Sequence, residues 1–157
     1  MQKEITSRTE LLDKDGNLVV CGWARRNLFV YDRERVRRRN RLKEWDFYQA
    51  SDGDMLVQVN FFNIAIASAA TAAVIDMRTG ERAECASITL GTVNRLHLPE
   101  VSDKPNEFSY SKGGVSLRFV TTENSRKVTF SGKAKGQPLT VELEMEFEPE
   151  DENITIV

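Results

Sequence analysis

The sequence predicts a single all-β domain over residues 1–157, with antiparallel strands and little helix. Its 157 residues are the length of one ordinary domain. Short stretches of alternating apolar and polar residues recur along the chain, and turn-forming Asp, Asn and Gly residues separate them. About eight or nine such stretches, with frequent turns between them, are typical of an antiparallel sandwich or barrel.

The composition excludes several other classes of protein. With 9 Gly, 4 Pro and apolar residues throughout, the chain is neither collagen-like nor disordered. The longest weakly polar run, residues 64–75, is too short to span a membrane and contains Ser68 and Thr71. The first ten residues are too polar for a signal peptide, so we expect a cytoplasmic protein.

Two cysteines, Cys21 and Cys85, lie in apolar stretches far apart in the sequence. Free cysteine is among the most buried residue types, so we expect two buried thiols rather than a disulfide. The chain has one histidine, His97, and lacks a CxxC motif and a Cys/His cluster. We therefore expect no metal and no cofactor.

Two hairpins are expected in the middle of the chain. Asp52 and Gly53 separate residues 44–50 from the alternating residues 55–62, which is a strong hairpin signal. Residues 64–77 contain six alanines, which favour a helix by propensity. The turn-forming residues 78–81 and the alternating residues 82–90 favour a second hairpin instead, in a crowded, curved sheet.

Further strands are expected at residues 18–22, 115–121, 127–132 and 139–148. The last has the clearest alternation, with Val141, Leu143 and Met145 on one face and glutamates on the other. Residues 154–157 again favour a strand. This ending predicts that the strand closes a sheet or that the chain continues in a longer protein.

Charge is distributed unevenly along the chain. Residues 25–43 contain nine basic and two acidic residues, and residues 142–152 contain seven acidic and no basic residues. The two segments could face each other, bind separate partners or lie in solvent. The candidate surface for an anionic partner comprises Arg25, Arg26, Arg37, Arg38 and Arg39. The acidic overall charge and the lack of a recognition motif argue against nucleic acid.

The segment 43–48, Lys-Glu-Trp-Asp-Phe-Tyr, is the most distinctive candidate site. On a strand, Glu44, Asp46 and Tyr48 share one face. Either Trp45 and Phe47 form core while the acids are solvated, or the segment lines a ligand cavity. The candidate wall of such a cavity comprises Trp23, Trp45, Tyr48 and Phe61. Asp46 and Glu44 are the candidate proton donors of an enzyme.

Three sequence blocks resemble the N-terminal part of the domain of unknown function 2804 (DUF2804) family. They are Gly-Trp-Ala-Arg-Arg at 22–26, Tyr-Asp-Arg at 31–33 and the segment 43–48, in this order and spacing. Residues 76–81 and Leu98-Pro99 also look like that family. Since family members are typically longer, the resemblance implies that the chain is an N-terminal half, with a second half or a second copy as partner.

That family is similar in architecture to the paired lipocalin-like domains of carotenoid hydratases. The resemblance implies a lipocalin-like, calycin-like antiparallel barrel or half-barrel. No catalytic residue of those hydratases has a matching motif here, so no activity carries over. The leading hypothesis is a domain that binds an apolar small molecule inside the barrel. The alternatives are a hydratase or isomerase-type enzyme, and an interaction module that uses residues 25–43.

Overall fold

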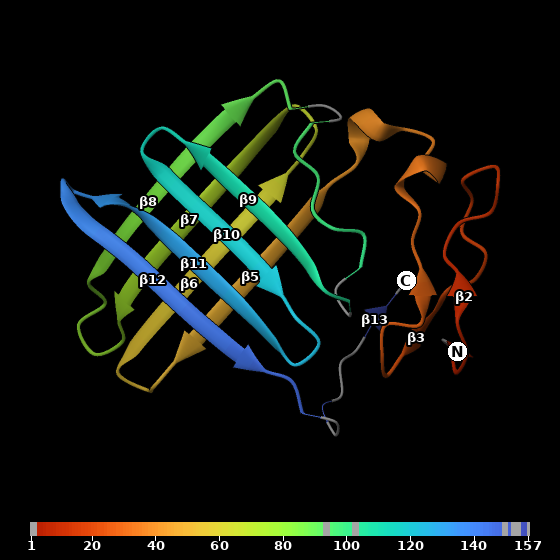
Figure 1. Ribbon diagram of the computed structural model, residues 1–157, viewed down its shortest axis with the longest axis horizontal. Helices are drawn as coiled ribbons and strands as arrows, with labels where there is room; N and C mark the ends of the chain where they lie inside the picture. Colours follow the sequence, from red (N-terminus) through yellow and green to blue (C-terminus); the bar gives the residue numbers. More distant parts are fainter. Residues whose placement is uncertain (1–2, 93–94, 102–103, 149–150, 152–154, 157) are drawn as a thin grey trace.

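Two four-stranded antiparallel sheets form the body of the protein, and a small N-terminal lobe lies at one end (Figure 1). The computed structural model describes residues 3–92, 95–101, 104–148, 151 and 155–156. One sheet has the order β5-β6-β7-β8, with β5 at Glu44–Ser51, β6 at Met55–Asn63, β7 at Ala67–Asp76 and β8 at Arg82–Leu90. The other has the order β12-β11-β10-β9, with β9 at Asn106–Lys112, β10 at Val115–Thr121, β11 at Ser125–Ala134 and β12 at Gln137–Glu146. The all-β, antiparallel prediction is confirmed.

Both expected hairpins are present, and side chains close their turns. The Asp52 carboxylate accepts hydrogen bonds from the backbone N–H groups of Asp54 and Met55. The alanine-rich segment is a strand, because β7 pairs with β6 on one side and with β8 on the other. Two ladders and the burial of its alanines override the helical propensity of this segment.

The N-terminal lobe contains two small sheets with their own core of Ile5, Ala24 and Phe29. Its elements are β1 at Lys3–Glu4, β2 at Thr9–Glu10, β3 at Gly22–Ala24, β4 at Phe29–Val30 and two short 3₁₀ turns at Arg33–Arg35 and Arg39–Arg41. β13 at Thr155–Ile156 pairs with β3 and so joins the last described residues to the N-terminal lobe. The strand expected at residues 18–22 is wrong: Leu18 forms only an isolated bridge, and β3 begins at Gly22.

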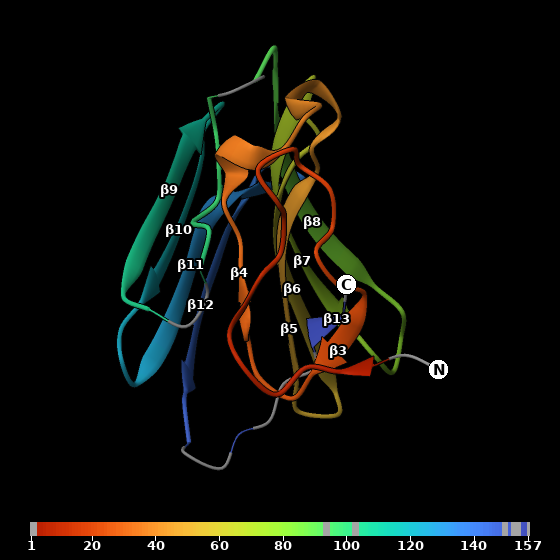
Figure 2. The ribbon, with the colours of Figure 1, turned by 90° about the vertical axis from the view of Figure 1, so that its right-hand side faces the viewer.

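The main core fills the space between the two large sheets. Phe61, Leu117, Phe119 and Phe130 are almost completely buried there. The ring centroids of Phe61 and Phe108 lie 4.4 Å apart, a distance typical of packed aromatic pairs. Figure 2 shows the two sheets as separate layers, with the lobe in front.

Of the expected barrel or half-barrel, the closed form is not observed. In the part of the chain that the structure describes, no ladder joins β8 to β9 or β12 to β5. The segment between β8 and β9 instead carries the chain from one layer to the other, and the strands of the two layers cross steeply (Figure 1). The fold is therefore two packed sheets whose side chains fill the interior.

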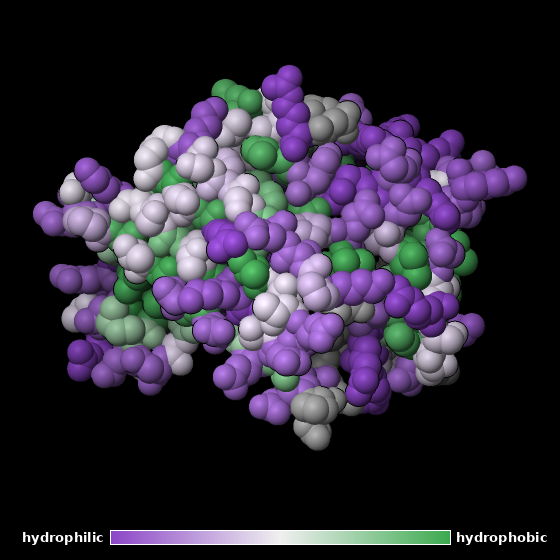
Figure 3. All heavy atoms as spheres, viewed as in Figure 1, coloured by the Kyte–Doolittle hydropathy of each residue, from purple (hydrophilic) through white to green (hydrophobic). Residues whose placement is uncertain are grey.

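The outer face of the β9–β12 sheet is polar, as the alternation in its last strand predicted. Glu142, Glu144 and Glu146 are exposed, while Val141 is buried. Figure 3 views the molecule over this sheet, where hydrophilic and near-neutral residues lie among some apolar ones. A row of like charges on an exposed strand also discourages edge-to-edge association of sheets.

The expectation of two buried thiols is confirmed for only one cysteine. Both cysteines are free, but only Cys85 is buried and Cys21 is exposed, because the apolar stretch around it is not a core strand. No helix among the described residues is long and apolar enough to cross a membrane. The described residues also contain no group of three His, Cys, Asp or Glu side chains arranged to hold a metal ion.

Replacing Phe119 with alanine tests the core. Its ring is fully buried, so we expect the free energy of unfolding, measured by urea denaturation, to fall by about 3–5 kcal/mol. Ser116→Ala, at an exposed position of the same strand, is the control and should change stability by less than about 0.5 kcal/mol. Equal effects of the two substitutions would contradict this core.

Candidate functional site

β5 turns its acidic side chains inward and two of its aromatic side chains outward. Trp45 is 65% exposed and Phe47 is 52% exposed, whereas the Glu44 side chain is only 10% exposed. The expectation that Glu44, Asp46 and Tyr48 share one face is confirmed. The interpretation of Trp45 and Phe47 as core residues is wrong, because arginines hold the acids on the inner side.

Glu44 lies at the centre of a polar cluster between the sheet and the lobe. The Arg33 Nε donates to Glu44 Oε1 at 2.8 Å, and the His97 Nδ1 lies 2.6 Å from Glu44 Oε2. Arg33 also donates to the Leu98 carbonyl oxygen at 2.5 Å and to Glu100 Oε1 at 3.3 Å. One guanidinium group therefore connects the lobe to β5 and to residues 97–100.

Asp46 connects the two large sheets. Arg126, on β11, donates from a terminal nitrogen to Asp46 Oδ2 at 2.5 Å, and the Tyr48 hydroxyl donates to the same oxygen at 3.2 Å. The Arg126 guanidinium lies over the rings of Tyr48 and Phe119, at 5.2 and 5.7 Å from their centroids. Burial, reinforced by the Asp46 charge, raises the pKa of the Tyr48 phenol above its usual value.

The two candidate proton donors are both engaged in ion pairs. Glu44 binds Arg33, and Asp46 binds Arg126. Each carboxylate thus accepts hydrogen bonds from a guanidinium group, an arrangement that fixes the side chain in place. The geometry thus gives these two residues a positioning role in β5.

The outward residues of β5 continue into an apolar surface across its sheet. Residues directly opposite each other on paired strands lie on the same face. The register aligns one apolar outer row of four residues, Trp45, Phe62, Ala69 and Ile88. Ile88 is 63% exposed and Leu90, farther along β8, is 77% exposed.

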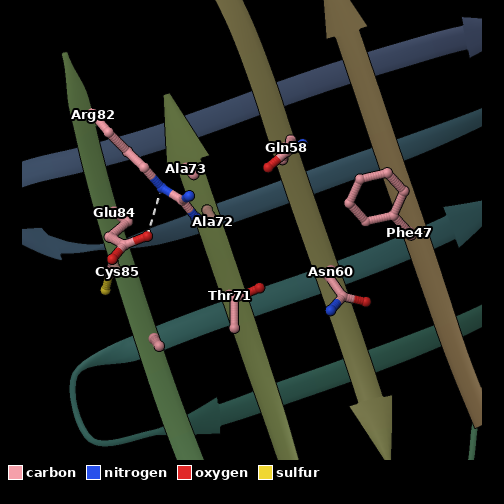
Figure 4. Close-up of a pocket in the computed structure, with 10 residues that line it drawn as sticks. Phe47, Gln58, Asn60, Thr71, Ala72, Ala73, Arg82, Glu84 and Cys85 are labelled. Atoms are coloured by element: carbon pink, nitrogen blue, oxygen red, sulfur yellow. Dashed lines mark ion pairs between the residues drawn. The ribbon is translucent and has the colours of Figure 1, made fainter. Parts of the chain in front are cut away.

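Next to this row, the outer face is hollowed. The hollow has a volume of about 510 Å³, within the range of about 300–1,000 Å³ common for ligand sites. Its lining residues are Phe47, Gln58, Asn60, Thr71, Ala72, Ala73, Arg82, Glu84, Cys85 and Ala86. Figure 4 shows Phe47 on one side and Arg82 with Glu84 on the other, with the polar residues of β6 and β7 between them. Small side chains of β7 and β8 leave the space open.

A second, smaller hollow of about 280 Å³ lies beside β5. Tyr31, Lys43, Glu44, Trp45, Asp46, Leu98 and Pro99 line it. The Tyr31 hydroxyl oxygen is buried and has no hydrogen-bond partner among the residues that the structure describes. Burial and the nearby Glu44 charge raise the pKa of this phenol, so it stays protonated and can donate.

The four residues expected to line one cavity do not meet. Trp45 is on the outer face, Tyr48 packs on the inner side and Phe61 is fully buried in the core. Trp23 lies in the N-terminal lobe, with the Arg25 guanidinium 5.4 Å from its ring centroid. Among the four, only Trp45 borders either of the two hollows.

The arginines of the expected anionic-partner surface lie in the N-terminal lobe. Arg25 pairs with Glu4, Arg37 donates to the Asn17 side chain, and Arg39 pairs with Glu34. Arg26 and Arg38 are exposed. Among the described ion pairs, none joins residues 25–43 to the acidic β12 strand, whose Glu142 pairs with Lys127. Residues 149–150 and 152 of the acidic segment lie outside the described residues.

Sequence reasoning missed the two organising arginines, Arg33 and Arg126. Arg33 was part of a run that looked solvated. Arg126 carried a local signal, because it alternates with Val128 and Phe130 on the buried face of β11. An arginine in phase with core residues of a strand indicates an inward charge that needs an acidic partner.

Comparison with known protein families matches residues 2–157 to the family described as Domain of unknown function (DUF2804). Searches of curated proteins and of solved structures found no match. The family match confirms the resemblance seen in the blocks around Trp23 and Trp45.

Breaking the inter-sheet ion pair tests its structural role. Arg126→Met leaves Asp46 without its cation, and we expect a loss of about 3 kcal/mol in unfolding free energy. The double variant Asp46→Leu with Arg126→Met should regain most of this loss, because it leaves no unpaired charge. Lys127→Met, which breaks an exposed pair on the same strand, should cost less than about 1 kcal/mol. A loss as small for Arg126→Met would contradict the anchoring role.

The buried phenol of Tyr48 should make the protein sensitive to alkali. The pKa of this phenol is raised in the folded state. As the pH rises, the unfolded chain therefore loses the proton first, at about pH 10. The stability contribution is complete below that pH and is lost as the pH rises above it. In Tyr48→Phe, the urea midpoint of unfolding should therefore fall less between neutral and alkaline pH than it does in the unaltered protein. Parallel losses in both proteins would contradict this assignment.

Proposed function

The chain belongs to the DUF2804 family, which is defined without an assigned activity. From the geometry, we propose that the domain binds an apolar small molecule on the outer face of the β5–β8 sheet. This face replaces the barrel interior as the candidate site, because packed aromatic side chains occupy the space between the sheets. The hollow of about 510 Å³ marks the place on that face.

The contrast between the two outer faces supports this proposal most directly. The β9–β12 sheet presents glutamates to solvent, whereas the β5–β8 sheet presents Trp45, Phe47 and Ile88. Single exposed apolar residues are ordinary, but contiguous apolar surface rimmed by polar residues indicates a binding site. Large aromatic side chains also contribute much of the free energy of binding when a ligand covers them.

The enzymatic alternative has less support. A hydratase or isomerase needs an acid that delivers a proton to its substrate, and Glu44 and Asp46 are both held by arginines. It remains testable: Glu44→Gln and Asp46→Asn should abolish any alkene hydration if these residues carry it. The interaction module that uses residues 25–43 predicts binding that weakens steeply with salt.

Two further proposals concern the architecture: that the domain is lipocalin-like, and that it forms the N-terminal half of a two-part arrangement. The unpaired edges of β5, β8, β9 and β12 among the described residues are compatible with a second half or a second copy alongside. The apolar outer face would bind its ligand in either arrangement.

Binding of the uncharged apolar dye N-phenyl-1-naphthylamine tests the proposed function. We expect a saturable rise in dye fluorescence with the purified protein. Trp45→Ala and Phe47→Ala should each weaken binding by about tenfold, the equivalent of roughly 1.4 kcal/mol of lost contact. Leu18→Ala removes an equally exposed apolar residue of the N-terminal lobe and should leave the affinity unchanged.

Two outcomes would contradict the proposal. One is the absence of saturable binding, and the other is an equal loss of affinity in Leu18→Ala and in the two sheet variants. Native mass spectrometry before and after organic extraction complements this test, because a mass excess that extraction removes reports a molecule bound during expression.

A further inference from the structure

The outer face of the β5–β8 sheet changes polarity along its strands. Its first row, Trp45, Phe62, Ala69 and Ile88, is apolar. Its second row is mixed, with Phe47, Asn60, Thr71 and Ala86. Its third row, Gln49, Gln58, Ala73 and Glu84, carries the amides and a carboxylate. A ligand that lies along the strands therefore meets apolar side chains at one end and hydrogen-bonding groups at the other.

Several polar atoms at the hydrogen-bonding end have no partner among the described residues. In the part of the chain that the structure describes, Asn60 makes no side-chain hydrogen bond and its Oδ1 is buried without a partner. The Thr71 hydroxyl, likewise, makes none with the described residues. The Gln58 amide nitrogen donates to Gln49 Oε1 at 2.9 Å, which leaves the Gln58 oxygen available. Amide and hydroxyl groups both donate and accept, so these side chains suit a ligand that does the same.

The hollow offers no unpaired charge. Arg82 and Glu84 are the charged residues among those that line it. They form an ion pair with 2.6 Å between Arg82 Nε and Glu84 Oε2, drawn as a dashed line in Figure 4. Because the two opposite charges lie side by side, the hollow presents no net charge to attract a carboxylate, sulfate or ammonium head. The hollow therefore favours an uncharged head.

Hydroxyl groups on a ring fit this description best. Each hydroxyl donates one hydrogen bond and accepts others, which matches the amides of Asn60 and Gln58 and the hydroxyl of Thr71. Figure 4 shows the Phe47 ring at the side of the same hollow, where it can cover the apolar face of a ligand ring. The distance from the row of Gln58 to the row of Phe62 is about 13 Å, at roughly 3.3 Å per residue, which leaves room for an attached apolar chain.

We propose that the ligand is an uncharged amphiphile, with a hydroxylated ring over Asn60 and Thr71 and an apolar chain across Trp45, Phe62 and Ile88. This inference rests on the proposed function and names the chemical class of its ligand. It adds a requirement that simple apolar binding lacks: the affinity depends on hydrogen-bonding groups of β6 and β7.

The test compares three probes that share an apolar chain: n-octanol, n-octyl β-D-glucoside below its micelle concentration, and n-octyl sulfate. Affinities are measured by displacement of N-phenyl-1-naphthylamine from the full chain. We expect the glucoside to bind at least about tenfold more tightly than octanol, a difference of roughly 1.4 kcal/mol. The sulfate should bind more weakly than the glucoside.

Two threonine variants locate the head group. Thr71→Val keeps the side-chain shape and removes the hydroxyl, so it should weaken glucoside binding by about fivefold to tenfold, as expected for one hydrogen bond, and leave octanol binding unchanged. Thr129→Val makes the same change on β11, in the other sheet, where Thr129 lies opposite Arg118 and Glu142. This control should affect the binding of neither probe. Unchanged octanol binding also shows that the variant is folded.

The outcomes separate the inference from the proposed function. If octanol and the glucoside bind equally, if the sulfate binds most tightly, or if Thr71→Val leaves the glucoside affinity unchanged, the amphiphile inference is wrong while apolar binding stands. If the dye binds but no probe displaces it, the amphiphile inference alone is wrong. If the dye does not bind, the proposed function fails and the inference fails with it.

Discussion

The two β5 carboxylates point inward, and the packing of the lobe and of both sheets follows from this orientation. An unpaired charge at this position would oppose folding, because burial of a charge is costly without a partner. Arg33 and Arg126 provide those partners from opposite directions, one from the N-terminal lobe and one from the facing sheet. Through alternate residues of a single strand, the lobe and both sheets are thereby held together.

This orientation also creates the candidate binding face. Successive side chains of a strand point to opposite sides, so once Glu44 and Asp46 point inward, Trp45 and Phe47 must point outward. Because these two aromatic rings are exposed, they do not contribute the stabilisation that burial of apolar surface gives to a core. They lie on a face that also carries Phe62 and Ile88. Next to them is the hollow, whose lining includes several small side chains. Such departures from the usual pattern are most often found at functional sites.

Much of the secondary structure followed from local signals. The Asp-Gly turn between β5 and β6 closes as expected, through hydrogen bonds to the Asp52 side chain. The alternation in β12 placed its glutamates outside correctly. The candidate site was only half predictable. Glu44, Asp46 and Tyr48 do share one face of β5, but that face points inward, whereas the interpretation with Trp45 and Phe47 in the core placed it in solvent. The expected cavity residues were dispersed among the lobe, the core and the outer face, because residues distant in sequence are brought together only by the packing of the sheets.

An all-β antiparallel fold, its main hairpins and membership of a family could be inferred from local features, because turns, alternation and motifs are properties of short stretches of chain. Tertiary structure alone decided that two sheets pack without closing into a barrel, and which side of β5 is inside. Alternation defines two faces of a strand but does not say which one is buried. That choice depended on Arg126, 80 positions away in the sequence, which places its charge opposite Asp46 once the sheets pack.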